Sequence, residues 1–168
     1  NCTPHFYESQ PHNVSLSLIE QYALARSMIM KTINTFLPHA DKLILAGAPG
    51  NHGEMTRTSK GQVATNRLDN SDTMHLQICE EIMAANKERY KNVTVNVPDG
   101  FHQVMTIKSI PCGWTHGHMT GYSGSNPENK IENWWKGQMY GFLPMSDVQI
   151  LITCLLYTSP IPRDTSSS

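Results

Sequence analysis

Apolar positions along the chain follow helical spacing and strand spacing in turn. In residues 15–36 the apolar side chains recur with helical periodicity, which predicts a helix with one buried face. Ser15 is a suitable cap for its start, and Pro38 is expected to end it. The positions on the expected buried face are Leu18, Tyr22, Ala25, Ile29 and Ile33. The apolar segment 42–47 comes next, and we expect it to form a short buried strand.

A polar segment and a second helix are expected in the middle of the chain. Residues 55–70 are polar and weakly patterned, which is typical of a surface loop. Ser71 or Asp72 is a suitable cap for a helix that runs to about Arg89. The apolar residues expected on its buried face are Ile78, Ile82 and Met83.

The rest of the chain predicts further strands and a third helix. Strand patterns occur at 93–97 and 101–110, and a short strand leads into 113–115. Asn126 followed by Pro127 is a strong helix start, because proline suits the first helical position. The third helix carries four large apolar residues, Ile131, Trp134, Trp135 and Met139, and at least one of the adjacent tryptophans is expected in the core. The last apolar segment, 148–154, predicts a final buried strand.

This alternation of helices and strands predicts an α/β fold. We expect a sandwich in which strands present polar turns at their ends. Residues 1–154 are expected to belong to one domain. Residues 155–168 interrupt the pattern with prolines and end in serines, so we expect a disordered or artefactual tail there.

Composition and charge exclude several classes of protein. The formal net charge of −1 gives no general reason to expect a nucleic-acid or membrane partner. The four cysteines are widely spaced and form no Cys-x-x-Cys pair, which excludes zinc-finger and thioredoxin-like sites. The sequence contains no signal peptide and no run of apolar residues long enough to span a membrane. We therefore expect a cytoplasmic protein of a bacterial or phage-infected cell.

The first candidate site is the Gly-Asn-His-Gly-Glu segment at 50–54. It directly follows the apolar segment 42–47, so Asn51, His52 and Glu54 are expected at the carboxyl end of a strand, where α/β sheets bind ligands. A phosphate-binding P-loop requires Lys and Ser or Thr after its last glycine. Glu54 stands there instead, which excludes the P-loop.

The second candidate site is the Trp-Thr-His-Gly-His segment at 114–118. His116 and His118 are two positions apart, so their side chains are expected on the same face of an extended segment. Imidazole nitrogens together with amide or carboxylate oxygens suit a divalent ion such as Mn, Fe or Zn.

These two segments resemble motifs of the calcineurin-like metallophosphoesterases, most closely the phage-type, DNA-exonuclease-like branch. The resemblance spans roughly residues 15–154. It implies a two-sheet sandwich flanked by helices, holding two divalent ions, of which Mn²⁺ is the first choice and Fe, Zn or Mg are alternatives. It also implies that Asn51 and His116 bind metal, that His52 faces the substrate, and that Glu54 orients His52. His118 is a further candidate ligand, with no fixed counterpart in the family pattern.

Three departures from the family pattern affect the expected activity. Gly53 displaces Glu54 by one position. The sequence has no upstream Asp-x-His or Gly-Asp motif and no downstream Gly-His-x-His motif. We therefore expect a domain truncated at both ends and inactive alone, because neutral ligands cannot offset the repulsion between two dications.

The resemblance implies a phosphoester substrate, such as a phosphodiester or DNA. Arg57, Lys60 and Arg67 in the polar loop are candidates to contact a phosphodiester backbone, although a solvated loop explains them as well. The alternative function is a non-catalytic, metal-stabilised binding or structural module of the same fold. The presence of His52 argues against this alternative, because a scaffold has no use for a substrate-facing histidine.

Overall fold

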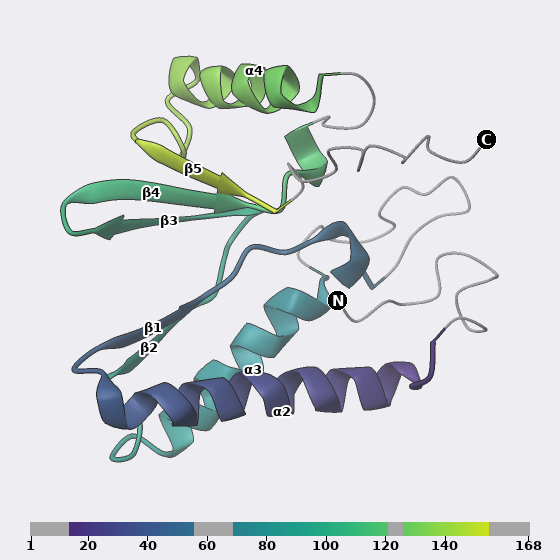
Figure 1. The fold of residues 1–168 in the computed structure, drawn as a ribbon, viewed down its shortest axis with the longest axis vertical. Coiled ribbons are helices and arrows are strands. Elements are labelled where there is room, and N and C mark those ends of the chain that lie inside the picture. The colour runs from purple at the N-terminus through teal and green to yellow at the C-terminus, as the bar shows by residue number, and fades with distance from the viewer. Residues whose placement is uncertain (1–13, 56–68, 121–125, 155–168) are drawn as a thin grey trace, which may run out of the picture. The chain divides into compact units, whose positions relative to one another are not determined.

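The computed structural model describes residues 14–55, 69–120 and 126–154 (Figure 1). These residues form a mixed α/β structure with three α-helices and two small open sheets. The chain divides into two compact units, Asn1–Gln103 and Val104–Ser168, and each is described by itself. The expected basic loop with Arg57, Lys60 and Arg67 and the expected tail 155–168 lie outside the described residues.

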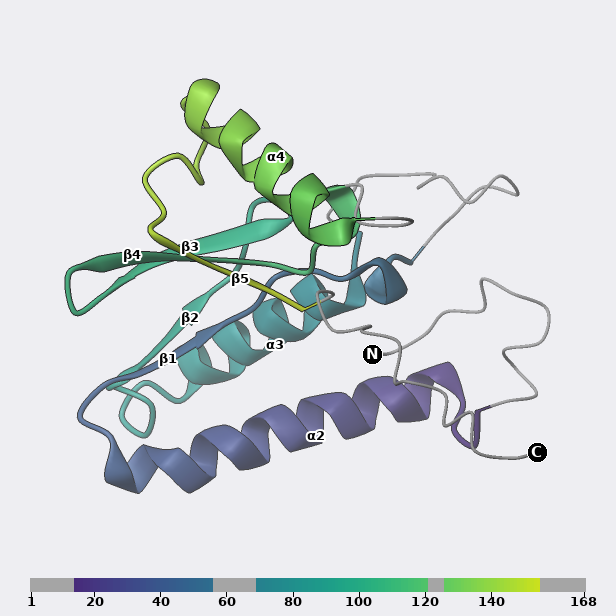
Figure 2. The ribbon, with the colours of Figure 1, turned by 45° about the horizontal axis from the view of Figure 1, so that its top comes forward.

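Unit 1 is a strand–helix–strand arrangement with one additional helix before it. Its elements are α2 (Leu18–Phe36), β1 (Leu43–Ala46), α3 (Ser71–Ala85) and β2 (Val93–Asn96). β1 and β2 are parallel, with Leu43 opposite Val93 and Ala46 opposite Asn96. Parallel neighbours need a crossover, and α3 lies in this connection. Figures 1 and 2 both show α2 beside α3 on the same side of the two strands.

The core of unit 1 lies between these two helices and the sheet. Its buried residues are Ile33, Cys79, Met83 and Tyr90. Leu43 and Leu45 of β1 pack against this cluster from the sheet. Ile33 is the only buried residue of α2, and the other positions expected on its buried face are half-buried. The predicted face is therefore the one that packs on the core, although only Ile33 is fully buried.

Both helix starts in unit 1 differ from the sequence prediction. The cap of α2 is Ser17, not Ser15, because Ser17 and Glu20 cap each other reciprocally. The cap of α3 is Asn70, whose side chain accepts a hydrogen bond from the Asp72 amide. α3 also ends at Ala85, earlier than predicted, and buries Leu76, Cys79 and Met83, while Ile78 and Ile82 are half-buried.

Unit 2 repeats the strand–helix–strand order after a hairpin. It contains most of β3 (His102–Ile107) and all of β4 (Ile110–Thr115), α4 (Pro127–Tyr140) and β5 (Ile150–Thr153). The strand order is β3-β4-β5, and β4 and β5 are parallel, with Thr115 opposite Thr153. The helix start at Pro127 is confirmed, although Asn126 is left-handed and its side chain makes no capping bond.

The predicted single strand at 101–110 is wrong. The strand stops at Ile107, and the chain reverses at Lys108 and Ser109, whose φ angles are 47° and 70°. Two consecutive left-handed residues are typical of a tight hairpin turn. The turn is made without glycine, which is why the sequence pattern did not reveal it.

The core of unit 2 lies where the segment after α4 meets β4. Met145 and Val148 are buried, and a Cβ on Gly113 would come within 2.7 Å of the Met145 Cε atom. Trp135 is half-buried and donates its indole N–H to the Met145 carbonyl at 3.4 Å. Trp134 is half-buried as well, so neither tryptophan lies fully in the core.

The predicted burial of two strands is wrong in part. Ile44 of β1 is 43% exposed, and Ile150 and Ile152 of β5 are each 46% exposed. Side chains alternate along a strand, so these residues point away from the helices that cover the other face.

Among the described residues, no helix has the length and apolar character needed to cross a membrane.

Candidate functional site

The Gly-Asn-His-Gly-Glu segment forms a turn at the carboxyl end of β1. The strand ends at Ala46, and Asn51–Gly53 form one short 3-10 turn. This turn is closed by a hydrogen bond from the Gly53 amide to the Gly50 carbonyl at 3.2 Å. The predicted position of the segment, at the carboxyl end of a strand, is therefore confirmed, and this strand belongs to a parallel pair.

The turn is tied to the start of α3 by two hydrogen bonds. The Gly50 amide donates to Asp72 Oδ2 at 2.9 Å, and Asn70 Nδ2 donates to the Gly50 carbonyl at 2.8 Å. Asn70 Oδ1 in turn accepts from the Asp72 amide at 2.9 Å. Both polar groups of Gly50 are therefore held by α3.

Gly53 has a packing reason to be glycine. A Cβ at this position would overlap Asn70 Oδ1 and lie 2.8 Å from Asp72 Oδ2. No side chain fits there without displacing the residues that hold the turn. Gly53 is the residue that shifts Glu54 by one position relative to the metallophosphoesterase motif. The close contact between the turn and α3 therefore explains why a glycine stands there.

Glu54, which follows the turn, is buried. Its side chain is 2% exposed, and its backbone forms an isolated antiparallel bridge with Asn70. The next residue continues the connection, because the Met55 amide donates to the Asp69 carbonyl at 3.0 Å. By contrast, Asn51 and His52 are only half-buried. The turn therefore presents Asn51 and His52 between two anchored points.

The second candidate segment forms a turn at the carboxyl end of β4. Gly117 has a φ of 96°, a conformation that favours glycine, so His116 and His118 lie on a turn and not on the extended segment expected. Thr115 Oγ1 accepts from the Gly117 amide at 3.3 Å, and Thr120 Oγ1 donates to the Gly117 carbonyl at 2.7 Å. The two imidazole rings nevertheless lie together, with centroids 5.3 Å apart.

The two candidate turns occupy equivalent places in their units. Each follows the first strand of a parallel pair and precedes the helix that leads to the second strand. The structure brings Asn51, His52 and Glu54 together in unit 1, and His116 and His118 together in unit 2. In such units the carboxyl end of the strand is the usual place for ligand contacts.

The donor atoms in the turns suit a divalent ion in type but not in number. An amide oxygen from Asn51 and imidazole nitrogens from His116 and His118 are suitable donors for Mn, Fe or Zn. Within the ranges that the structure describes, however, no group of three or more His, Cys, Asp or Glu is placed to hold a metal ion. The described donors of neither unit complete a metal centre by themselves.

Sequence reasoning missed the two residues that hold the first turn. Asn70 and Asp72 flank Ser71 at the start of α3, and only helix-capping roles were considered for this segment. The signal that could have found them is the run Asn70-Ser71-Asp72, which offers several side-chain oxygens at one helix start. What the sequence does not show is that Gly50 would be their partner.

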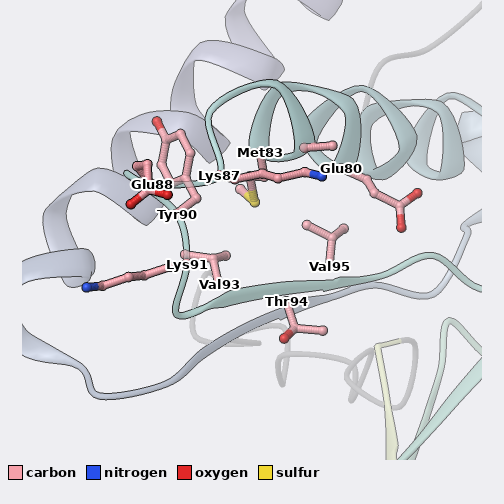
Figure 3. A pocket seen from close by; sticks show the side chains of 10 residues that line it. Glu80, Met83, Lys87, Glu88, Tyr90, Lys91, Val93, Thr94 and Val95 are labelled. Carbon is pink, nitrogen blue, oxygen red and sulfur yellow. The ribbon is translucent and has the colours of Figure 1, made fainter.

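A groove of about 520 Å³ lies in unit 1, away from the candidate residues. It runs along the second half of α3 and β2, with Met83, Tyr90 and Val95 among its apolar lining (Figure 3). Lys87 and Glu88 contribute charges of both signs. None of the residues of the 50–54 turn lines this groove, so it is not part of the candidate site.

His75 is a buried titratable residue on α3 that the sequence did not single out. His75 is 4% exposed, and its ring packs edge-on against the Tyr22 ring, with the two ring centroids 5.5 Å apart. Burial lowers the pKa of His75 because it disfavours the charged imidazolium; Asp72 opposes this shift and Arg26 adds to it. His75 is therefore neutral in the folded chain near neutral pH.

The lowered pKa of His75 predicts a loss of stability in acid. The unfolded chain binds a proton at this residue below the ordinary pKa of 6.5, whereas the folded chain resists it. The free energy of unfolding should therefore fall as the pH drops below 6.5 until the lowered pKa is passed. Urea denaturation at several pH values measures the free energy of unfolding. Its fall below pH 6.5 should be smaller for His75→Gln than for the wild type. His39→Gln, at an exposed position, is the control, and an unchanged slope in His75→Gln would contradict the prediction.

Comparisons with protein families, with curated proteins and with solved structures find no match to this chain. Membership of the metallophosphoesterases is therefore an expectation that rests on the residues of the two turn segments.

Proposed function

We propose that this chain belongs to a metal-dependent phosphoester hydrolase, a phosphodiesterase or nuclease with a dinuclear metal site. The observation that carries the proposal is the anchored turn at the end of β1, which holds Asn51 and His52 at consecutive positions. In this proposal the two sheets are parts of the two-sheet sandwich of the metallophosphoesterases. The protein would act in the cytoplasm, and DNA is the macromolecular substrate that we propose.

Each candidate residue has a defined task in the proposed reaction, in which Glu54 would orient His52. Asn51, through its side-chain oxygen, and His116 would hold the divalent ions, with His118 beside His116. Two such ions, when bound, supply an activated water and neutralise the phosphate oxygens. His52 donates a proton or hydrogen bond to the leaving oxygen, which is general-acid help worth about 10²–10⁴-fold. No protein nucleophile is required for this chemistry.

Hydrolysis of bis-p-nitrophenyl phosphate by the full-length gene product tests the proposal. We expect turnover with Mn²⁺, loss of turnover after chelation, and recovery when Mn²⁺ is returned. The full-length product is the right sample because the resemblance implies carboxylate ligands from motifs that these 168 residues do not contain. Absence of metal-dependent hydrolysis by a folded, Mn²⁺-loaded protein would contradict the proposed function.

The two histidines of the second turn should differ in their effect on metal binding. If His116 is the ligand, His116→Ala should weaken Mn²⁺ binding by more than about 100-fold, which exceeds the usual effect of a residue that only supports a ligand. His118→Ala should weaken it by about 10-fold, because His118 packs beside the His116 ring. Calorimetric titration of the full-length gene product measures both. A larger defect in His118→Ala would reverse the assignment.

A non-catalytic, metal-stabilised module is the second candidate function. It is a candidate because the hydrogen bonds from Asn70 and Asp72 to Gly50 stabilise the fold whether or not the turn is catalytic. The same assay separates the two candidates, since a module of this kind would gain thermal stability from Mn²⁺ and hydrolyse nothing.

A further inference from the structure

The peptide of Gly50 is fixed from both sides by the start of α3. Its amide donates to Asp72 Oδ2 at 2.9 Å, and its carbonyl accepts from Asn70 Nδ2 at 2.8 Å. Asn70 is 2% exposed, so water cannot readily replace its amide in this contact. The residue that directly precedes Asn51 and His52 is thus held by two buried or partly buried side chains.

The far end of the turn is held by the same segment. Glu54 forms a backbone bridge with Asn70, and Gly53 leaves no space between the turn and the side chains of Asn70 and Asp72. Only three residues separate Gly50 from Glu54, so their backbone has little freedom once both ends are fixed. The half-buried side chains of Asn51 and His52 leave from this restricted backbone.

We propose that Asn70 and Asp72 are positioning residues that hold Asn51 and His52 in the orientation used by the site. The catalytic consequence of this assignment rests on the proposed function, whereas its geometric part does not. Neither residue needs to touch substrate. Their effect passes through Gly50 and Gly53, and a small misplacement of a reacting group is costly to a reaction rate.

The competing explanation is that Asn70 serves only as the cap of α3. Asn70→Ser separates the two roles, because serine is an equally good cap but has no amide to donate to the Gly50 carbonyl. In the 168-residue chain we expect α3 amides to keep their protection from hydrogen exchange. The NMR signals of the Gly50 amide and the His52 ring should shift or broaden.

Asp72 offers a second test through a conservative replacement. Asp72→Asn keeps a side-chain oxygen that can accept from the Gly50 amide, whereas Asp72→Ala keeps none. We expect the Gly50 and His52 signals of Asp72→Asn to stay near those of the wild type, and those of Asp72→Ala to move. The matched control is Ser17→Ala, which removes the cap of α2 and should leave both signals unchanged.

Turnover of bis-p-nitrophenyl phosphate by the full-length gene product gives the functional readout. Asn70→Ser should lower kcat by about 10- to 100-fold with little change in KM, and Ser17→Ala should leave both constants unchanged. Unmoved Gly50 and His52 signals in Asn70→Ser, with α3 intact, would overturn the assignment. Moved signals in a protein whose wild type hydrolyses nothing would support the positioning role and overturn the proposed function instead.

Discussion

His52→Ala in the full-length gene product is expected to lower turnover of bis-p-nitrophenyl phosphate by about 10²–10⁴-fold, the usual contribution of a general acid. The bound Mn²⁺ should remain, because the proposed function gives metal binding to Asn51 and substrate contact to His52. The loss should appear in kcat, since the donated proton matters only as the leaving oxygen departs. Steady-state kinetics and metal analysis of the same samples measure both quantities.

The control for this substitution is His39→Ala, which changes an exposed histidine outside the turn and should leave kcat and metal content unchanged. Glu54→Gln is a useful second variant. Glu54 is buried next to the turn, so its replacement should affect His52 only through its position and not by removing its side chain. If His52→Ala loses metal and activity in equal measure, then His52 is a ligand and the roles within the turn are wrongly assigned.

Ile33→Ala is expected to destabilise unit 1 by about 2–5 kcal/mol, which is typical of removing a large aliphatic side chain from a core. Ile33 is 3% exposed and lies in the cluster with Cys79, Met83 and Tyr90. Because the chain has two units, the loss is best measured by native-state hydrogen exchange of the β1 and β2 amides. A global melting curve would mix the two units.

The same helix supplies a matched control for this loss. Ile19 is 79% exposed, so Ile19→Ala removes the same atoms from α2 without opening a cavity. Its effect should stay within about 0.5 kcal/mol. Equal effects of the two substitutions would mean that α2 does not pack on the sheet through Ile33.

The helices were predictable from sequence because their apolar spacing is long and regular. α2 and α4 were placed correctly, and Pro127 marked the start of α4. The exact starts of α2 and α3 were wrong by one to three residues, since Ser15, Ser17, Asn70 and Ser71 are all suitable caps by type. Only the local geometry of Ser17 with Glu20 and of Asn70 with Asp72 decides between them.

The strands expected at 42–47, 93–97 and 148–154 were predictable in position but not in burial, whereas the hairpin within 101–110 was missed. Short apolar runs suggested strands covered on both faces, yet Leu43 and Leu45 face the helices while Ile44 is exposed. Sequence alone cannot tell how many layers cover a short strand, because the covering elements come from distant parts of the chain.

The candidate site was predictable only as far as Asn51 and His52, the residues that the first turn presents. The apolar run before Gly50 placed Asn51 and His52 at a strand end, which the structure confirms. Asn70 and Asp72 were not predictable as partners of Gly50, because these hydrogen bonds join positions 20 and 22 residues apart. The metal assignments of Asn51, His116 and His118 remain predictions.

The hairpin turn between β3 and β4 bears on how easily this chain can be engineered. Lys108 and Ser109 are exposed and both adopt the left-handed conformation, which costs roughly 1–2 kcal/mol for each residue with a Cβ. Asn-Gly is the pair that such tight turns favour. Directed evolution for thermostability would therefore find some of its most accessible gains at these two positions. Because they lie outside both candidate turns, such gains could compensate for destabilising changes made to alter substrate preference.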